Sequence, residues 1–214
     1  MITNIKNLKG IIYDFDGVIA DSNDVKKNAF QKMYFKYGKK ISMDIGNHHL
    51  LNGGMSRYDK LRLYHKKYLN IDLSDDSLTE LANEFSNIVL DDVVKADYIP
   101  GVKEYIYMTQ KKYKLFISTG TPTKEIKEIL RRRGIDEFFT DVYGSPEKKE
   151  NHLKQILSKY KMKPNDLIFF GDSKSDLLAA KTCNINFMLI MNAHNTSLQK
   201  KFDCKRINDF NELL

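Results

Sequence analysis

GIIYDFDGVIADS, residues 10–22, is the stretch of sequence that decides the fold. Its first half is a short apolar run bounded by glycines, which is typical of a buried strand in a parallel sheet. Asp14 and Asp16 follow at the carboxyl end of this strand, where open parallel sheets place their active sites. Two carboxylates so close together repel each other unless a cation or a shared proton lies between them. A turn or a helix cap is the alternative interpretation, because Asp and Gly are common turn residues.

Apolar runs of the same kind recur along the chain and alternate with helical patterns. We expect further strands at residues 113–118, 140–143, 166–170 and 186–191, and helices at residues 104–111, 123–133, 149–160 and 176–182. This alternation predicts an α/β fold with a Rossmann-like parallel sheet covered on both faces.

Residues 23–96 interrupt the alternation, because they show helical periodicity at 25–37, 57–68 and 77–89 and no convincing strand. Ser77 with Glu80 predicts a capping box that opens the last of these helices. We therefore expect an inserted α-helical subdomain at 23–96 within a core made of residues 1–22 and 97–214. Hinges are expected at 20–23 and 97–101.

The composition narrows the classes of protein that fit. The 214 residues, 42% of them hydrophobic and 29% charged, suffice for one domain with a sizeable insert or for two small ones. No apolar run is long enough for a membrane span, and no export signal is visible, so the cytoplasm is the expected location. The two cysteines stand apart, which argues against a disulfide framework and a cysteine-based zinc site.

Positive charge is in excess, with 35 Lys and Arg against 28 Asp and Glu, a formal charge of +7. The basic residues are scattered in short pairs without a basic tail, which is typical of a lysine-rich solvated surface. No aromatic and basic nucleic-acid motif is present, so neither a nucleic acid nor a membrane is an expected partner.

A second acidic segment reads IFFGDSKSD at residues 168–176. Asp172 and Asp176 follow a strand and are spaced by one helical turn, so both can face one spot. Two strands that each end in acids predict a carboxylate cluster suited to Mg²⁺.

Two further segments end strands with polar residues. LFISTGTP at residues 115–122 supplies hydroxyls and free backbone N–H groups suited to a phosphate oxygen, although Thr121 or Thr123 would equally serve as a helix cap. GSPEKK at residues 144–149 places Lys148 and Lys149 after the short strand, where a lone lysine is usually an ordinary surface residue.

The order and spacing of these four segments resemble the haloacid dehalogenase superfamily of phosphohydrolases, from residue 10 to about residue 190. The resemblance implies that Asp14 is the nucleophile that forms an aspartyl phosphate, and that Asp16 is the acid/base whose backbone carbonyl also binds the metal. It implies that Asp172 is a Mg²⁺ ligand and that Asp176 supports the metal or orients a lysine.

The same resemblance assigns the phosphate-binding residues. It implies that the hydroxyl of Thr119 binds the phosphoryl group in the same segment as Gly120, with Ser118 as the alternative register. Lys149 is the expected partner of nucleophile and phosphate, with Lys148 as the competitor. Mg²⁺ and a lysine together offset the repulsion between a carboxylate and a phosphate. An acid at position 16 favours phosphoryl transfer over dehalogenation, which needs no acid there.

The helical insert lies where members of this superfamily with a type 1 cap carry theirs. Within it, NGGMSRYDK at residues 52–60 resembles the cap specificity loop of β-phosphoglucomutase and phosphoglycolate phosphatase. Arg57 and Lys60 are expected to bind substrate there, with Arg57 clamping a carboxylate or a second phosphate. The alternative is an ordinary helix-opening loop with Arg57 in solvent. The five histidines, His48 and His49 among them, are expected on the surface or in supporting positions, because adjacent histidines give poor zinc geometry.

These features together predict a Mg²⁺-dependent phosphatase acting on a small phosphorylated metabolite, either a sugar phosphate or a phosphorylated organic acid such as phosphoglycolate, as a monomer or homodimer. A sugar-phosphate mutase is the nearest alternative, but the mutase pattern has a histidine where this chain has Asp24, Val25 and Lys26. A non-catalytic basic protein that binds RNA or a partner is the other alternative, and the filled catalytic positions argue against it.

Overall fold

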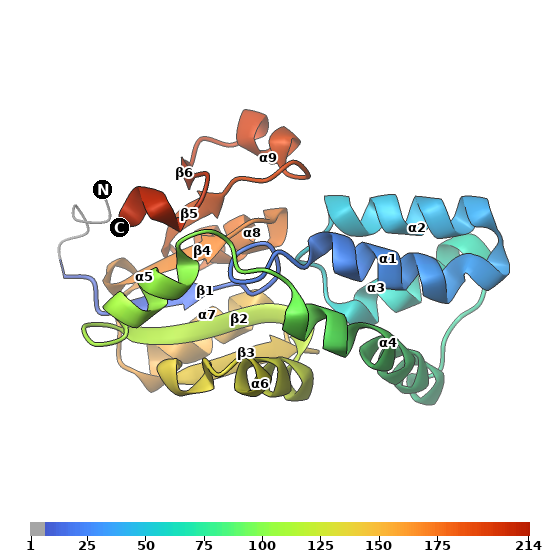
Figure 1. The fold of residues 1–214 in the computed structure, drawn as a ribbon, viewed down its shortest axis with the longest axis horizontal. Coiled ribbons are helices and arrows are strands. Elements are labelled where there is room, and N and C mark those ends of the chain that lie inside the picture. The colour runs from blue at the N-terminus through green and yellow to red at the C-terminus, as the bar shows by residue number, and fades with distance from the viewer. Residues whose placement is uncertain (1–6) are drawn as a thin grey trace.

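A six-stranded parallel sheet forms the centre of the computed structural model, which describes residues 7–214 (Figure 1). The strand order is β3-β2-β1-β4-β5-β6, and every neighbouring pair is parallel. The strands are β1 (Gly10–Tyr13), β2 (Lys114–Pro122), β3 (Asp141–Ser145), β4 (Leu167–Gly171), β5 (Asn186–Ile190) and β6 (Lys205–Ile207). The predicted parallel α/β sheet is confirmed, with β1 in its interior and every residue of β1 buried.

Helices cover both faces of the sheet, as predicted. Ile11 and Tyr13 of β1 pack in a cluster with α5 and α6, whereas Ile12 packs with α7 and α8 on the other face. The helices of this part are α5 (Val102–Thr109), α6 (Thr123–Arg132), α7 (Lys149–Lys159), α8 (Lys174–Thr182) and α9 (Thr196–Lys201), with short helices η4 (Asp136–Phe138), η5 (Pro164–Asp166) and η6 (Phe210–Leu213). The opposite directions of Ile11 and Ile12 follow from the two-residue period of a strand.

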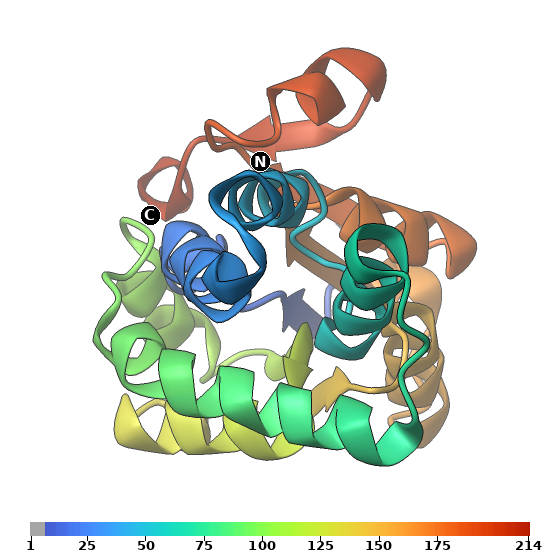
Figure 2. The same ribbon diagram turned by 90° about the vertical axis from the view of Figure 1, so that its right-hand side faces the viewer.

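The segment between β1 and α5 is helical and lies beyond the carboxyl ends of the strands (Figures 1 and 2). It contains α1 (Asn23–Tyr34), η2 (Phe35–Tyr37), α2 (Lys39–Leu51), α3 (Arg57–Tyr64), the π-helical η3 (His65–Leu69) and α4 (Asp75–Lys95). Helix α2 was not expected from the sequence. The predicted capping box at Ser77 is wrong, because α4 begins earlier and the side chain of Ser74 accepts the N–H of Ser77.

The chain enters and leaves this helical segment through two crossings that hydrogen-bond to each other. The N–H of Asp21 donates to the carbonyl of Asp97 over 2.8 Å, and the N–H of Ile99 donates to the carbonyl of Ile19 over 3.0 Å. Ala20 and Tyr98 form an antiparallel bridge between them. Because the two crossings are hydrogen-bonded to each other, we expect them to move together when the helical segment moves relative to the sheet.

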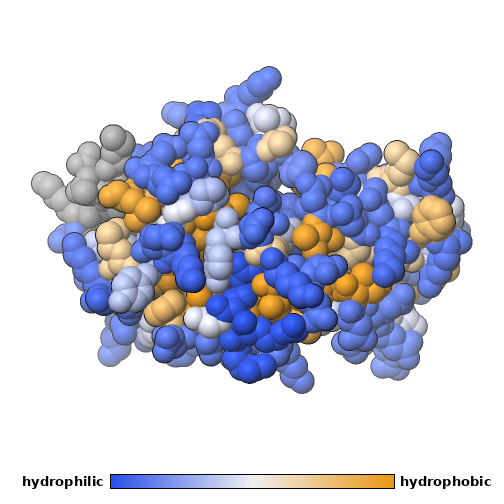
Figure 3. Space-filling view, in the orientation of Figure 1, coloured by the Kyte–Doolittle hydropathy of each residue, from blue (hydrophilic) through white to orange (hydrophobic). Residues whose placement is uncertain are grey.

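The surface is largely hydrophilic on the face that Figure 3 presents, with hydrophobic residues lying between the polar ones in small groups. Within residues 7–214, no helix combines the length and the apolar character that crossing a membrane requires.

Candidate active site

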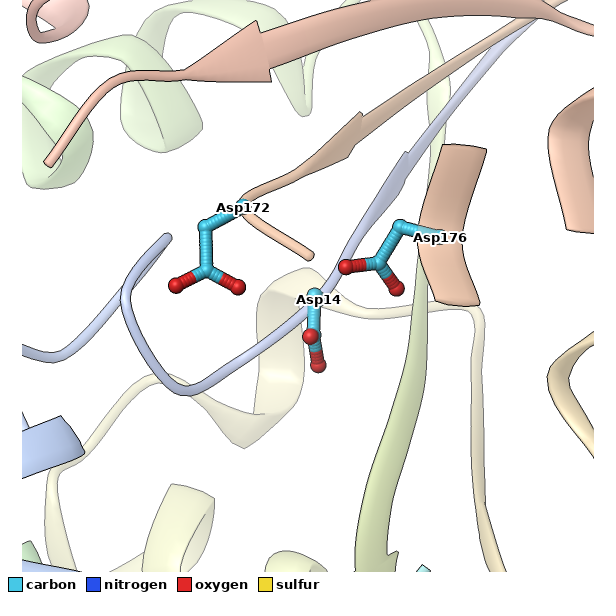
Figure 4. A group of neighbouring side chains, drawn as sticks. All are labelled: Asp14, Asp172 and Asp176. Atoms are coloured by element: carbon cyan, nitrogen blue, oxygen red, sulfur yellow. The ribbon is translucent and has the colours of Figure 1, made fainter. Parts of the chain in front are cut away.

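Three buried carboxylates meet at the carboxyl edge of the sheet (Figure 4). Asp14 directly follows β1, Asp172 follows the neighbouring strand β4, and Asp176 lies in the first turn of α8. The parallel register of β1 and β4 brings the first two together, since Tyr13 pairs with Phe170 and the N–H of Asp14 donates to the carbonyl of Phe170. One oxygen from each carboxylate lies within 4.8 Å of the others.

Burial makes this cluster electrostatically unfavourable without a cation. Desolvation raises the pKa of Asp14 to about 7, a rise that Lys149 opposes and Asp176 reinforces. Desolvation, with the charges of Asp14 and Asp176, raises the pKa of Asp172 to about 8. Both amide groups that bond Asp172 use its Oδ2 atom, and within the described chain its Oδ1 atom accepts no hydrogen bond. Buried, closely spaced carboxylate oxygens are the donors that Mg²⁺ prefers, so the residues fit such an ion.

Lys149 belongs to the same cluster. Its ammonium lies 2.6 Å from Asp14 Oδ2 and also donates to Asp176 Oδ1. Burial disfavours its charge, but Asp14 and Asp176 outweigh burial and raise the pKa of Lys149. Lys148, the competing lysine in the sequence, is exposed. The geometry therefore brings Lys149, and not Lys148, to the predicted nucleophile.

Asp16 stays outside this cluster and has its own partners. Its carboxylate accepts hydrogen bonds from Ser22 over 2.6 Å and from Thr121 over 3.1 Å, and it forms a buried ion pair with Lys26. Burial raises the pKa of Asp16, but the charge and hydrogen bond of Lys26 with the two hydroxyls outweigh it, so the net pKa is lowered. Thr121 thus bonds Asp16 and caps no helix, since α6 has no side-chain cap. Sequence reasoning missed Lys26 in this role; its signal was a lysine in the helix that follows the first motif.

The two hydroxyls of the second motif have different surroundings. Ser118 Oγ lies 3.0 Å from Nδ1 of the buried His152. Thr119 lines a cavity of about 280 Å³ together with Gly120 and Lys149. This arrangement favours Thr119 over Ser118 as the hydroxyl beside the phosphoryl position.

The loop at residues 53–55 of the helical segment closes over this site. A Cβ atom on Gly54 would lie 1.9 Å from Ser175 Oγ and 2.2 Å from Ser173 Oγ, so glycine permits the approach. A Cβ atom on Gly120 would lie 3.3 Å from the carbonyl oxygen of Met55. The loop therefore contacts both the acidic motif after β4 and the phosphate-binding motif in the carboxyl-terminal half of β2.

Arg57 does not lie in solvent, so that alternative is wrong. Its side chain is buried, and its two terminal nitrogens each lie 2.6 Å from a carboxylate oxygen of Glu125 on α6. It also donates to Ser86 and lies 4.5 Å from the ring centre of Phe85. In this arrangement Arg57 joins the helical segment to α6, and the predicted contact with a substrate group stays a prediction. Sequence reasoning missed Glu125, an acid in the first turn of the helix after the second motif.

Lys60 and His49 lie together under the closed loop. The ammonium of Lys60 is 3.0 Å from His49 Nδ1 and 3.2 Å from the carbonyl oxygen of Gly53. Both side chains are buried and line a second cavity that also reaches Asp14 and Asp16. Three predicted substrate-binding residues, Arg57, Lys60 and Gly120, thus line the same cavity as the nucleophile.

Comparison with known proteins identifies related phosphatases and a shared fold. A phosphorylated carbohydrates phosphatase of Thermotoga maritima is 28% identical over 184 residues, covering 83% of this chain and 82% of that protein. A phosphoglycolate phosphatase of Vibrio parahaemolyticus is 29% identical over 184 residues, covering 82% of this chain and 80% of that protein. The fold resembles a crystal structure of β-phosphoglucomutase from Clostridium difficile, with a TM-score of 0.78, 19% identity and coverage of 97% and 93%. The family model of haloacid dehalogenase-like hydrolases matches residues 11–190, and the chain belongs to that family.

Proposed function

We propose that this protein is a Mg²⁺-dependent phosphatase that hydrolyses a small phosphomonoester, a sugar phosphate or a phosphorylated organic acid, through an aspartyl phosphate on Asp14. The observation that carries the proposal is the buried contact between Asp14 and Lys149 within a carboxylate cluster beneath the helical segment. The names of the two phosphatase relatives support the same activity. In this proposal residues 23–96 are the cap over a core of residues 1–22 and 97–214, in a cytoplasmic monomer or homodimer.

Asp14 acts as the nucleophile. One of its carboxylate oxygens forms a bond to phosphorus while the bond from phosphorus to the leaving oxygen breaks. Lys149 and the hydroxyl of Thr119 hold the phosphoryl oxygens during this transfer. A bound Mg²⁺ ion supplies the charge neutralisation that lets a carboxylate approach a phosphate. Splitting the hydrolysis into transfer to Asp14 and release to water replaces one difficult displacement by two easier ones.

Asp16 handles the proton in both halves of the reaction. It gives a proton to the leaving oxygen in the first half and takes one from the attacking water in the second. In the structure, however, the ion pair with Lys26 favours the ionised form of Asp16. Asp16 must therefore break its ion pair with Lys26 and take up a proton before it acts as an acid. The ion pair thus controls when Asp16 can protonate the leaving oxygen in the first half of the reaction.

A phosphate-release screen tests the proposal. Sugar phosphates, phosphoglycolate, nucleotides and pyrophosphate are each incubated with Mg²⁺, and then with a chelator in its place. We expect turnover of at least one small phosphomonoester with Mg²⁺, reversible loss with the chelator and loss in Asp14→Asn. The matched control is Asp76→Asn, which changes an exposed acid on α4. No phosphate release from any substrate would contradict the proposal, and conversion of a sugar phosphate into its isomer would assign a mutase instead.

A further inference from the structure

Lys60 differs from the other buried cations around the active site because it has no counter-ion. Lys26 pairs with Asp16, and Lys149 pairs with Asp14. For the buried Lys60, no carboxylate of residues 7–214 lies within ion-pairing distance, and its ammonium meets only His49 Nδ1 and the carbonyl of Gly53 as hydrogen-bond partners. Burying an ammonium without an opposite charge is unfavourable in free energy. An anionic ligand beside Lys60 would reduce this unfavourable free energy.

His49 provides a second, independent observation. Its side chain is 3% exposed, and its Nε2 atom makes no hydrogen bond within the described structure. Since Lys60 donates to Nδ1, the proton of the neutral ring resides on Nε2, which leaves a buried donor without an acceptor. Burial, the neighbouring Lys60 and other cations lower the pKa of His49. Burial and Lys26 outweigh the more distant opposite charge of Asp16 and lower the pKa of Lys60 to about 7. The surroundings of both groups thus contain too much positive charge.

The two side chains are placed where the far end of a substrate would lie. They line one cavity on the side of the helical segment together with Asp14, Asp16 and Gly120, and with the two paired cations Lys26 and Arg57. In this closed arrangement the free volume is about 20 Å³, close to the space that a single water molecule needs. A carboxylate or a phosphate is larger than this space, so it binds there only when the helical segment moves apart from the sheet, and it then lies near the phosphorus that Asp14 attacks.

We propose that Lys60 and His49 form a subsite for a second anionic group of the substrate, a carboxylate or a second phosphate carried a few bonds from the transferred phosphate. This inference rests on the proposed function. It assigns to Lys60 and His49 the binding of the second anionic group that the sequence suggested for Arg57. The anion accepts hydrogen bonds from the ammonium of Lys60 and from His49 Nε2, and it supplies the counter-ion that Lys60 lacks. Arg57 stays paired with Glu125.

Calorimetric binding to Asp14→Asn in the presence of Mg²⁺ tests the subsite without requiring turnover. The ligands are phosphoglycolate, ethylene glycol bisphosphate and 2-hydroxyethyl phosphate, which share a two-carbon skeleton and differ in the second group. We expect at least one of the two doubly anionic ligands to bind about 10- to 100-fold more tightly than the hydroxyl compound, as charge-assisted hydrogen bonds allow. Which of the two binds identifies the carboxylate or the phosphate as the natural group.

Adding Lys60→Met or His49→Gln should abolish most of this preference, with thermal unfolding confirming that each variant folds. The control is Lys66→Met, which changes an exposed lysine paired with Asp72 in the same helical segment. Equal binding of all three ligands, or a preference that survives both substitutions, would overturn the subsite. If the binding preference depends on Lys60 but the protein releases phosphate from none of the substrates in the screen, the subsite stands and the proposed hydrolysis is refuted.

Discussion

The ion pair between Arg57 and Glu125 predicts that Glu125→Gln weakens closure of the helical segment. Arg57 lies on α3 of that segment and Glu125 lies on α6, so the pair bridges the segment and the helices of the sheet. Its two N to O distances are 2.6 Å, and both side chains are buried. Burial raises the pKa of Glu125, but the hydrogen bonds and charge of Arg57 outweigh it and lower the net value, so the pair is ionised at neutral pH.

The magnitude follows from this geometry. Removing one partner of a buried ion pair costs about 3–5 kcal/mol, because the remaining charge stays buried and unpaired. The cost falls on the closed arrangement, since opening the segment returns Arg57 to water. We therefore expect the closure equilibrium to weaken by about 3 kcal/mol, which corresponds to about 100-fold. Because part of this loss is hidden while the closed form still predominates, kcat/KM should fall by about 10- to 100-fold. The hidden part lowers the free energy of unfolding, so the melting temperature should fall by only a few degrees, at about 2–4 °C per kcal/mol.

Steady-state hydrolysis and thermal unfolding measure the two effects separately. The matched control is Glu128→Gln on the same helix, where the partly exposed Glu128 pairs with the exposed Arg131 and the substitution should change neither quantity. An unchanged or higher kcat/KM in Glu125→Gln would refute closure by this pair, and a higher value would indicate that Glu125 competes with the substrate for Arg57. A large fall in melting temperature at unchanged kcat/KM would assign the pair to folding alone.

Three further predictions concern other contacts of the site. Lys26→Met removes the charge that lowers the pKa of Asp16, so Asp16 should keep its proton to higher pH. The alkaline limb of the pH–rate profile should then move to higher pH for alkyl phosphates but not for p-nitrophenyl phosphate, whose leaving group needs no proton. An unmoved limb for the alkyl phosphates would contradict the role of Asp16. Gly54→Ala should lower kcat/KM about tenfold, the equivalent of about 1.4 kcal/mol, because the added Cβ atom would clash with Ser173 and Ser175. Gly53→Ala is the control and should not lower it, because no atom lies nearer than 3.9 Å to the added Cβ atom. Equal effects of the two substitutions would rule out the close approach of Gly54 as the cause. The pKa values of Asp14 and Asp172 are raised to about 7 and 8, so from about pH 4 to pH 8 these two carboxyls hold protons in the folded chain that Mg²⁺ must displace. Mg²⁺ should therefore raise the melting temperature by an increment that grows as the pH rises through this range. An increment independent of pH would argue against metal binding at these carboxylates.

The sequence predicts the sheet well because its signals are local. β1, β2 and β4 are short apolar runs that end in glycine, acids or hydroxyls, β5 is a further short apolar run, and each was predicted to within a few residues. Helix α2 was missed because the face it buries carries Ser42, Gly46 and His49 beside Ile45, which gives little hydrophobic periodicity. Helix α9 and strand β6 were missed because each is too short to show a clear pattern.

The sequence predicted the site residues that lie near strand ends, but not the contacts that depend on how helices pack. The four motifs place Asp14, Thr119, Lys149 and Asp172 at strand ends, and parallel topology then brings such ends together. The pairing of Arg57 with Glu125 joins residues 68 positions apart through the packing of two helices, and no spacing rule encodes that contact. The burial of Lys60 against His49 likewise depends on how α2 and α3 pack, and α2 itself was not foreseen.

Trapping of the phosphoenzyme tests directly whether Asp14 is the nucleophile. The protein is mixed with Mg²⁺ and the best substrate from the screen, quenched in acid within the first turnover, digested and analysed by mass spectrometry. The account predicts one added phosphoryl group on the peptide that contains residues 10–22, located on Asp14 and absent from Asp14→Asn. A phosphoryl group on another residue, or turnover by Asp14→Asn at the original rate, would contradict it.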